Sequence, residues 1–107
     1  MAEAWVEAVR ELKRVVEAKF GSSVRQIKLF GSRARAAARP DSDIDLLVLM
    51  DLVDRQKELQ VVDLAFEISL KYGVLLSPMV LSEDSYRARK QIGSQFVEVI
   101  EREGILI

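Results

Sequence analysis

Two aspartates one residue apart carry the most distinctive chemistry of the sequence. Asp43 and Asp45 begin the apolar run Ile44–Met50, which is typical of a buried strand. Residues i and i+2 of a strand project from the same face, so the two carboxylates should lie side by side. Paired carboxylates repel each other unless a cation lies between them or one takes up a proton. With oxygen ligands alone, the expected cation is Mg²⁺ or Mn²⁺.

A Gly-Ser pair follows the preceding apolar segment and could bind an anion. Where a strand turns into a helix, the free N–H groups of the first turn favour phosphate. Gly31 would let the backbone approach the anion closely, and Ser32 could donate its hydroxyl. Arg33 or Arg35 could add charge-assisted contacts. The plainer alternatives are an ordinary turn and a solvated helix face that also includes Arg39.

Together the two features match what a nucleoside triphosphate with bound Mg²⁺ requires, an anion site beside a metal-binding pair. One short connection could bring the Gly-Ser turn and the aspartates together. The alternative is that Asp41, Ser42 and Asp43 are turn residues and that Asp45 is a solvated strand start. The combination of both features favours the metal–triphosphate interpretation.

The composition narrows the chemistry further. The 107 residues include no His and no Cys, which excludes thiolate catalysis, disulfides, a histidine base and the usual zinc ligands. A formal net charge of −1 makes direct binding of nucleic acid a minor alternative. No apolar run approaches the ~20 residues that span a bilayer, so no membrane association is expected. A chain without cysteine suits the cytoplasm, which is the expected location.

The elements that must position these residues follow from periodicity and turn residues. We expect a helix at 2–20, a strand at 24–30, a short helix at 33–39 that Pro40 ends, and a strand at 44–50. A further helix should lie between the N-cap Asp54 and Gly73. A strand at 74–82, with Pro78 at an edge or bulge, and one or two helices from Ser82 should complete the chain. The expected core faces are Trp5, Val9, Leu12, Val16 and Phe20, then Leu59, Val62, Phe66 and Leu70, then Ile92, Phe96, Val99 and Ile100. This order predicts a single α/β (α+β) domain over residues 1–107, with a three- to four-stranded mixed sheet and flanking helices.

The stretch "GSRARAAARPDSDIDLLV" resembles the signature of the polymerase-beta-type nucleotidyltransferases. In its length and sequence the chain resembles the small members of that group, the minimal nucleotidyltransferases. The resemblance implies that Gly31 and Ser32 bind the nucleotide and that Asp43 and Asp45 are catalytic metal ligands. Small members of the family are often encoded beside a HEPN-domain toxin. In such pairs the nucleotidyltransferase is the antitoxin and can transfer AMP from ATP to the toxin. The resemblance therefore implies Mg²⁺-dependent transfer of AMP to a hydroxyl of a HEPN-type partner.

The sequence departs from the family pattern at a third carboxylate, which is usual on a later strand. Leu75, Leu76 and Ser77 occupy the corresponding segment. The acids that could replace it, if the fold turns one inward, are Asp63, Glu67, Glu83 and Asp84. Without a third acid, a rival function is a catalytically weak nucleotide-binding module that neutralises a partner by contact.

Two apolar features have open interpretations. Trp5 is either a core residue or a platform on which a base stacks. The tail 105–107 could cap the core, fray, or form an interface with a partner or a second copy.

Overall fold

The structure is a computed structural model that describes residues 3–36, 38–39 and 41–107. In chain order the elements are α1 (Ala4–Phe20), β1 (Val24–Phe30), β2 (Ile44–Met50), α2 (Arg55–Tyr72), β3 (Leu76–Ser82), α3 (Glu83–Gln91), α4 (Gln95–Glu103) and β4 (Ile105–Leu106), with 3₁₀ turns at Gly21–Ser23 and Gly31–Arg33. The predicted α/β class with a mixed sheet and flanking helices is confirmed.

The sheet has four strands in the order β3-β2-β1-β4. β1 pairs antiparallel with β2 and with β4, whereas β2 and β3 run parallel and are joined by α2 as a crossover helix. In this register Asp45 of β2 lies beside Phe30 of β1 on one side and Ser77 of β3 on the other. The strand that carries Asp45 is therefore an inner strand of the sheet.

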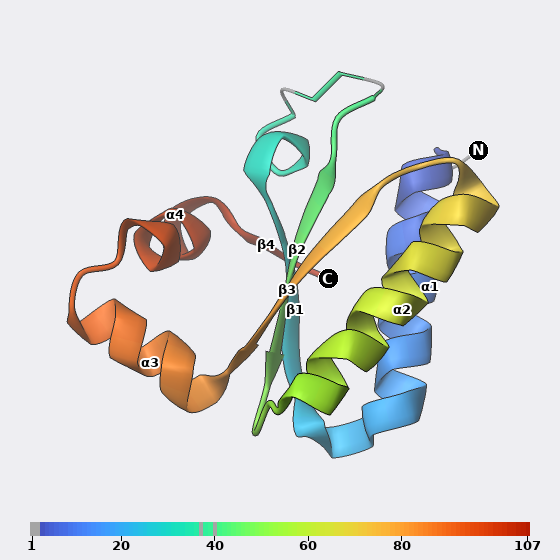
Figure 1. The fold of residues 1–107 in the computed structure, drawn as a ribbon. Helices are drawn as coiled ribbons and strands as arrows, with labels where there is room; N and C mark the ends of the chain where they lie inside the picture. The colour runs from blue at the N-terminus through green and yellow to red at the C-terminus, as the bar shows by residue number, and fades with distance from the viewer. Residues whose placement is uncertain (1–2, 37, 40) are drawn as a thin grey trace.

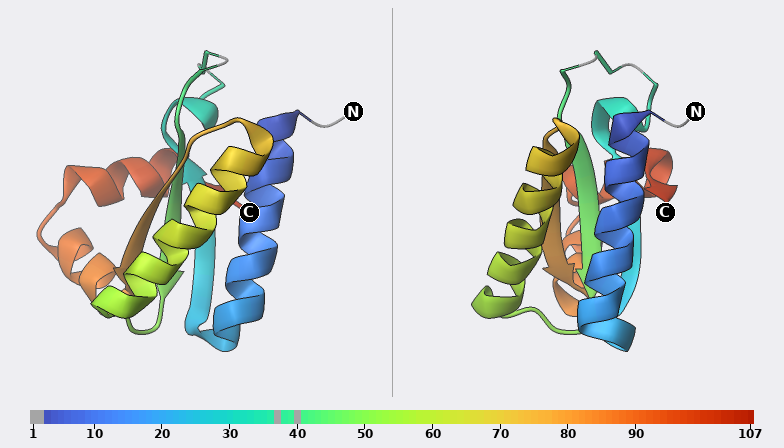
Figure 2. Two further views of the ribbon diagram at one scale, coloured as in Figure 1. Left: turned by 45° about the vertical axis from the view of Figure 1, so that its right-hand side comes forward. Right: turned by 90° about the vertical axis from the view of Figure 1, so that its right-hand side faces the viewer.

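Helices cover both faces of the sheet. Figure 1 views the sheet edge-on, with α1 and α2 on its right and α3 and α4 on its left; the turned views of Figure 2 show α1 and α2 side by side on one face. Along β2, Leu46 and Val48 pack in the core beneath α1 and α2, whereas Leu47 and Leu49 pack with residues of α3 and α4. Because side chains alternate along a strand, Asp45 projects from the α3/α4 face.

The predicted apolar face of α1 is confirmed. Val9, Leu12 and Val16 are buried, and Trp5 and Phe20 pack against the same cluster at the two ends of the helix. Trp5 is thus a partly buried core residue. The helix begins at Ala4. Residue 2, where the predicted helix starts, lies outside the described residues.

Both predicted ends of α2 are confirmed. The Asp54 side chain accepts a hydrogen bond of 2.8 Å from the backbone N–H of Lys57, which satisfies a free donor of the first turn. At the other end Gly73 adopts a left-handed conformation, with φ +66°, as a C-terminal cap. These caps fix which part of the chain crosses between β2 and β3.

The predicted core face of α2 is wrong. Its four residues Leu59, Val62, Phe66 and Leu70 are exposed by 41–69%, whereas Val61, Ala65 and Ile68 are buried. Both sets have helical spacing, so periodicity could not choose between them. Ser69 decides the orientation, because its hydroxyl donates to the Ala65 carbonyl and accepts the N–H of Leu76, which ties that side of the helix to β3.

The predicted short helix at 33–39 is also wrong. The described residues after β1 form the 3₁₀ turn Gly31–Arg33 and a further turn over 34–36, while residues 37 and 40, including the predicted stop at Pro40, lie outside the described residues. Two helical turns nucleate poorly without packing, whatever the propensity of Ala and Arg. Ala36 leaves the right-handed region altogether, with φ +56°.

The predicted β3 strand begins later than expected, at Leu76 rather than residue 74, and Pro78 does lie on an edge strand. Ser82 caps α3 as predicted by accepting the N–H of Ser85. In the last predicted stripe Ile100 is buried and Phe96 packs edge-on against Phe30, with ring centroids 5.5 Å apart.

Ile92 was expected in the same core face and is 83% exposed, because it follows the end of α3 and lies in the turn before α4. Val97 is buried in its place. The tail is not frayed, since β4 pairs with β1 and the N–H of Ile107 donates to the Ile27 carbonyl at 2.9 Å. Among the described residues, no helix combines the length and the apolar character needed to cross a bilayer.

Candidate nucleotide and metal site

The Gly-Ser turn packs directly onto the Asp45 carboxylate. Gly31 has φ +74°, a left-handed conformation that side chains rarely adopt. A Cβ atom on Gly31 would overlap Oδ2 of Asp45 and lie 3.2 Å from its Cγ. Only glycine fits this position. The Gly-Ser turn and the Asp45 carboxylate, which were expected from the sequence to lie together, are therefore in contact.

The two aspartates form a pair of like charges at the start of β2. Asp43 is exposed, and Asp45 is half-buried beneath the turn. Burial raises the pKa of Asp45, the negative charge of Asp43 raises it further, and the Arg35 guanidinium partly offsets both effects. A cation held between the carboxylates would relieve this repulsion.

The donor set fits a hard divalent cation. The pair offers only carboxylate oxygens, and the whole sequence has no His or Cys that would favour a softer metal. Mg²⁺ in proteins is commonly bound by one or two carboxylates and completes its shell with water and phosphate oxygens. Asp43 and Asp45 would be the protein ligands of such an ion.

Arg35 is held near the aspartates by the far end of the chain. Its Nη1 forms an ion pair of 3.3 Å with Oε2 of Glu103 at the end of α4. Half of the Arg35 side chain remains exposed, so the guanidinium can still meet an anion from solvent. No local pattern predicts this contact, because the two residues are 68 positions apart.

Arg33 lies on the other side of the turn. Its guanidinium stacks over the Trp5 ring, 5.0 Å from the centroid, and Nη2 donates to the Ser42 carbonyl at 3.3 Å. Arg33 and Trp5 line a pocket of about 400 Å³ with Tyr72 of α2. Ser32 is half-buried in the turn itself. Of the predicted nucleotide-binding residues, Gly31 and Arg35 therefore approach Asp45, and Arg33 turns toward α1.

Ser42 closes the loop between the turn and the aspartates. Its Oγ accepts the N–H of Arg39 at 2.8 Å, and its own N–H donates to the Arg39 carbonyl at 3.0 Å. Sequence reasoning treated Ser42 only as a turn residue, although a Ser between two Asp residues is a common signal for side-chain bonds to the local backbone. Its hydrogen bonds fix the direction in which the chain enters β2.

None of the four acids proposed as a third carboxylate approaches the pair. Ser77 occupies the strand position beside Asp45. Glu83 follows β3 at the opposite end of the sheet, since Ser82 alone is five residues beyond Ser77, roughly 16 Å along a strand. Asp84 is exposed beyond Glu83 in α3.

Asp63 and Glu67 are exposed on α2, which covers the opposite face of the sheet from Asp45. Within the described part of the chain, no group of three or more acidic side chains is arranged to hold a metal ion. In those residues the site therefore has a carboxylate pair and a serine where a third acid would lie.

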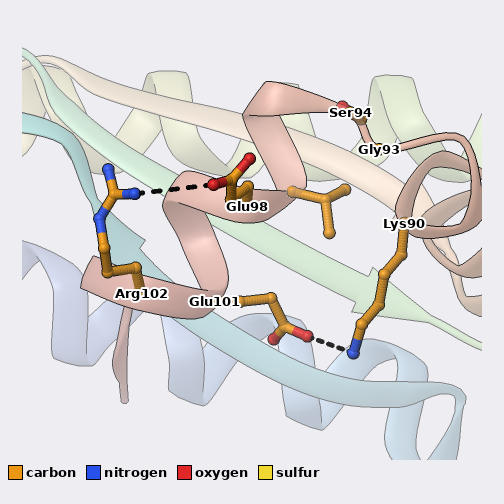
Figure 3. Close-up of a pocket in the computed structure, with 7 residues that line it drawn as sticks. Lys90, Gly93, Ser94, Glu98, Glu101 and Arg102 are labelled. Atoms are coloured by element: carbon orange, nitrogen blue, oxygen red, sulfur yellow. Dashed lines mark hydrogen bonds and ion pairs between the residues drawn. The ribbon is translucent and has the colours of Figure 1, made fainter.

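A separate hollow of about 530 Å³ lies beside α4, at the turn from α3. Figure 3 shows its charged side chains directed at each other: Lys90 pairs with Glu101 at 2.7 Å and Arg102 with Glu98 at 4.0 Å. Because these charges compensate one another, the hollow presents no net charge to a ligand.

Known proteins resemble this chain in sequence and in fold. The nucleotidyltransferase domain family matches residues 9–106. Two proteins of Methanocaldococcus jannaschii, named "Putative protein adenylyltransferase MJ0141" and "Putative protein adenylyltransferase MJ0604", are 30% and 35% identical; the alignments cover 94% and 92% of this chain, and 95% and 92% of those proteins.

Two solved structures show the same arrangement of elements. One is described as a "putative minimal nucleotidyltransferase", with 25% identity, a TM-score of 0.60 and coverage of 99% of this chain and 97% of that chain. The other is a "toxin-antitoxin with AMP-PNP", with 18% identity, a TM-score of 0.61 and coverage of 90% and 69%. The second likeness concerns the fold alone.

The family match confirms the prediction of a nucleotidyltransferase, and it spans both the Gly-Ser turn and the aspartate pair. The chain thus belongs to the nucleotidyltransferase domain family, as a polymerase-beta-like minimal nucleotidyltransferase.

Proposed function

We propose that this chain transfers AMP from ATP, in the presence of Mg²⁺, to a hydroxyl group of a partner protein. The observation that carries the proposal is the contact between the Gly31 turn and the Asp45 carboxylate beside Asp43. The names of the two archaeal relatives support protein as the acceptor and an adenylyl group as the cargo. The nucleotide analogue in one structural neighbour is consistent with ATP as the donor.

Each residue of the site has a distinct role in this proposal. Asp43 and Asp45 hold the metal ion, which when bound would neutralise charge on the triphosphate and on the phosphorus under attack. Gly31 lets the turn approach the phosphates, and Ser32 donates its hydroxyl to them. Arg35 adds a positive charge from the rim of the site, and it is better placed for this than Arg33 because it lies nearer Asp45.

We propose that the acceptor is a HEPN-type toxin encoded beside this chain. By transferring AMP to the toxin, the chain would act as its antitoxin in the cytoplasm. Resemblance to the minimal nucleotidyltransferases supports this assignment, as does a fold shared with a chain of a toxin–antitoxin structure. The partner would supply the hydroxyl that attacks the α-phosphorus, with pyrophosphate as the leaving group.

Labelled ATP tests the proposal directly. The purified chain is incubated with Mg²⁺, ATP labelled at the α-phosphate and the product of the neighbouring gene. We expect label on the partner and a mass increase of one AMP, both lost with Asp45→Asn. Asp84→Asn, at an exposed position of α3, is the matched control and should transfer like the wild type. A complex that forms without any transfer of label would overturn the enzymatic proposal.

A second function, neutralisation of the partner by binding alone, is favoured by Ser77 at the position beside Asp45. General-base assistance is commonly worth ~10²–10⁴-fold, so a chain without it could bind ATP and transfer slowly. The two functions differ in what Asp45→Asn does to toxicity. A variant that still neutralises the toxin supports binding, and one that no longer does supports transfer.

A further inference from the structure

An apolar stripe on the outer face of α2 is left uncovered by the described part of the chain. The stripe consists of Leu59, Val62, Phe66 and Leu70, which succeed one another at helical spacing. They are four of the ten large apolar side chains exposed in the described residues. Single exposed apolar residues are ordinary, but a contiguous row on one helix is typical of an interaction surface.

A groove runs alongside this α2 stripe. It has a volume of about 370 Å³ and is lined by Val62 of α2 and by Pro78 and Met79 of the edge strand β3. Arg89 of α3 also lines the groove. The stripe forms a ridge and the groove lies beside it. A second helix can pack on such a surface by ridges-into-grooves contacts.

The edge of β3 is unsuited to binding an added strand. In the parallel pair with β2, the Ile44 N–H donates to the Leu75 carbonyl, so Leu76, Pro78 and Val80 point their backbone groups outward. The Leu76 N–H is already bound by the Ser69 hydroxyl, and proline has no N–H. A partner at this surface must therefore engage side chains rather than extend the sheet.

The unpaired charges that α2 itself carries beside the stripe are acidic. The other charged residues of α2 are all in ion pairs, namely Arg55 with Glu58, Lys57 with Asp51 and Lys71 with Glu11. Asp63 and Glu67 form no ion pair within the described residues. At about 100° per residue, both lie on the flank of the stripe opposite Val62 and the groove. Two adjacent like charges without a local partner favour a basic ligand.

We propose that the α2 stripe binds an amphipathic helix of another protein, whose apolar seam packs on Leu59, Val62, Phe66 and Leu70 and whose basic residues pair with Asp63 and Glu67. Such a helix-in-groove mode needs apolar anchors at i, i+3, i+4 and i+7 and complementary charge at the rim. The surface lies on the face of the sheet opposite Asp45, so the helix and a nucleotide can bind together. The inference stands whether or not the chain transfers AMP.

A second copy of this chain is a poorer occupant. An antiparallel pair of α2 helices centred between Val62 and Phe66 brings the same flank of each helix together. Asp63 would then meet Glu67 of the other copy, and the reverse pair would form as well. Like charges across such a seam are destabilising, whereas lysine or arginine on a different helix would pair with them.

Two synthetic helices test the surface on the intact chain. Each peptide has about 18 residues and leucine at alternating three- and four-residue spacing, flanked by lysine in one peptide and by glutamate in the other. We expect saturable binding of the lysine peptide, measured by fluorescence anisotropy, and at least ten-fold weaker binding of the glutamate peptide. The double variant Asp63→Lys/Glu67→Lys should reverse this preference.

Matched variants distinguish binding at the α2 stripe from nonspecific hydrophobic or electrostatic binding of the peptide. Phe66→Ser should weaken binding of the lysine peptide at least ten-fold, whereas Ile92→Ser, at an exposed site in the turn between α3 and α4, should not. Asp84→Lys/Glu98→Lys changes the net charge equally and should keep the preference for lysine. Since all these side chains are exposed, circular dichroism should show wild-type folding.

Three results would overturn the proposal. The first is the absence of saturable binding of the lysine peptide. The second is an unchanged preference in Asp63→Lys/Glu67→Lys. The third is a wild-type dimer in light scattering that Phe66→Ser converts to a monomer, because the stripe would then be covered by a second copy.

Discussion

Gly31 joins the two halves of the candidate site at a single backbone position. Its left-handed φ turns the chain out of β1, and its missing side chain leaves room for the Asp45 carboxylate. These are separate demands on one residue. One is conformational, and the other is a matter of space.

Gly31→Ala should therefore weaken binding of Mg²⁺–ATP at least ten-fold, because the new Cβ displaces Asp45. Gly73→Ala is the matched control: Gly73 has a similar φ of +66°, but no atom lies within 4 Å of an added Cβ. Both variants should lose about 1–2 kcal/mol of stability from the left-handed backbone. Calorimetric titration measures binding, and equal affinity in the two variants would contradict the contact with Asp45.

Ser77 offers a test of what the site lacks. It lies directly beside Asp45 across the parallel β2–β3 pair, so Ser77→Asp would place a third carboxylate at the candidate metal site. We expect tighter Mn²⁺ binding and faster AMP transfer, by up to the ~10²–10⁴-fold that a general base provides. Ser77→Asn has the same shape without the charge and should do neither. Unchanged Mn²⁺ affinity in a folded Ser77→Asp protein would place the metal elsewhere.

At the scale of elements, α1 and α2 are tied together at their surface by Glu11. Its Oε1 accepts hydrogen bonds from Lys71 Nζ at 2.9 Å and from the Tyr72 hydroxyl at 2.8 Å. The hydrogen bond from Lys71, followed by that from Tyr72, lowers the pKa of Glu11 below its ordinary value of 4.5. The charged carboxylate thus binds to α2 more favourably than the neutral acid.

The sign of the pH dependence follows from that lowered pKa. Glu11 contributes stability above pH 4.5, where it is charged in the folded and unfolded chains alike, and loses the contribution as the pH falls through the lower folded pKa. The melting temperature of Glu11→Gln should therefore lie below that of the wild type at pH 7 and converge with it toward pH 3. A gap that persists at pH 3 would show that the tie is independent of charge.

The elements differ in how well the sequence could predict them. The ends of α2 were predictable, because Asp54 and Gly73 are local signals that act through the adjacent backbone. The orientation of α2 was not, because two apolar sets share the helix and the choice depends on the contact of Ser69 with β3. The expected helix at 33–39 failed for a related reason, since helix propensity over one or two turns is weaker than the contacts of the turn with Asp45 and Ser42.

The proximity of the aspartate pair and the Gly-Ser turn was predictable, because both lie within 15 residues of chain and one short connection joins them. Their partners from distant elements were not. Glu103 meets Arg35 and Trp5 meets Arg33 only after the sheet and both helical layers have assembled. No local pattern marks either pair.

For the molecule as a whole, a ligand that binds the folded state alone must raise its stability. At a concentration of 100 Kd, Mg²⁺–ATP should add about 2.7 kcal/mol, which corresponds to roughly 10 °C in melting temperature for a domain of this size. Asp43→Ala/Asp45→Ala should show no such shift, while its ligand-free melting temperature matches or exceeds that of the wild type because the repulsion is gone. Differential scanning fluorimetry measures both values, and an equal shift in the double variant would remove the aspartates from the metal site.

The alternation of β2 has an evolutionary consequence. Leu46 and Val48 face α1 and α2 and belong to the core, while Asp45, the proposed metal ligand, lies on the opposite face of the same strand. Under the proposed function, a mutation of Asp45 would abolish AMP transfer and leave the core on the other face of the sheet unchanged. Proteins of this fold could therefore lose catalysis and keep binding, and the two kinds would have the same fold.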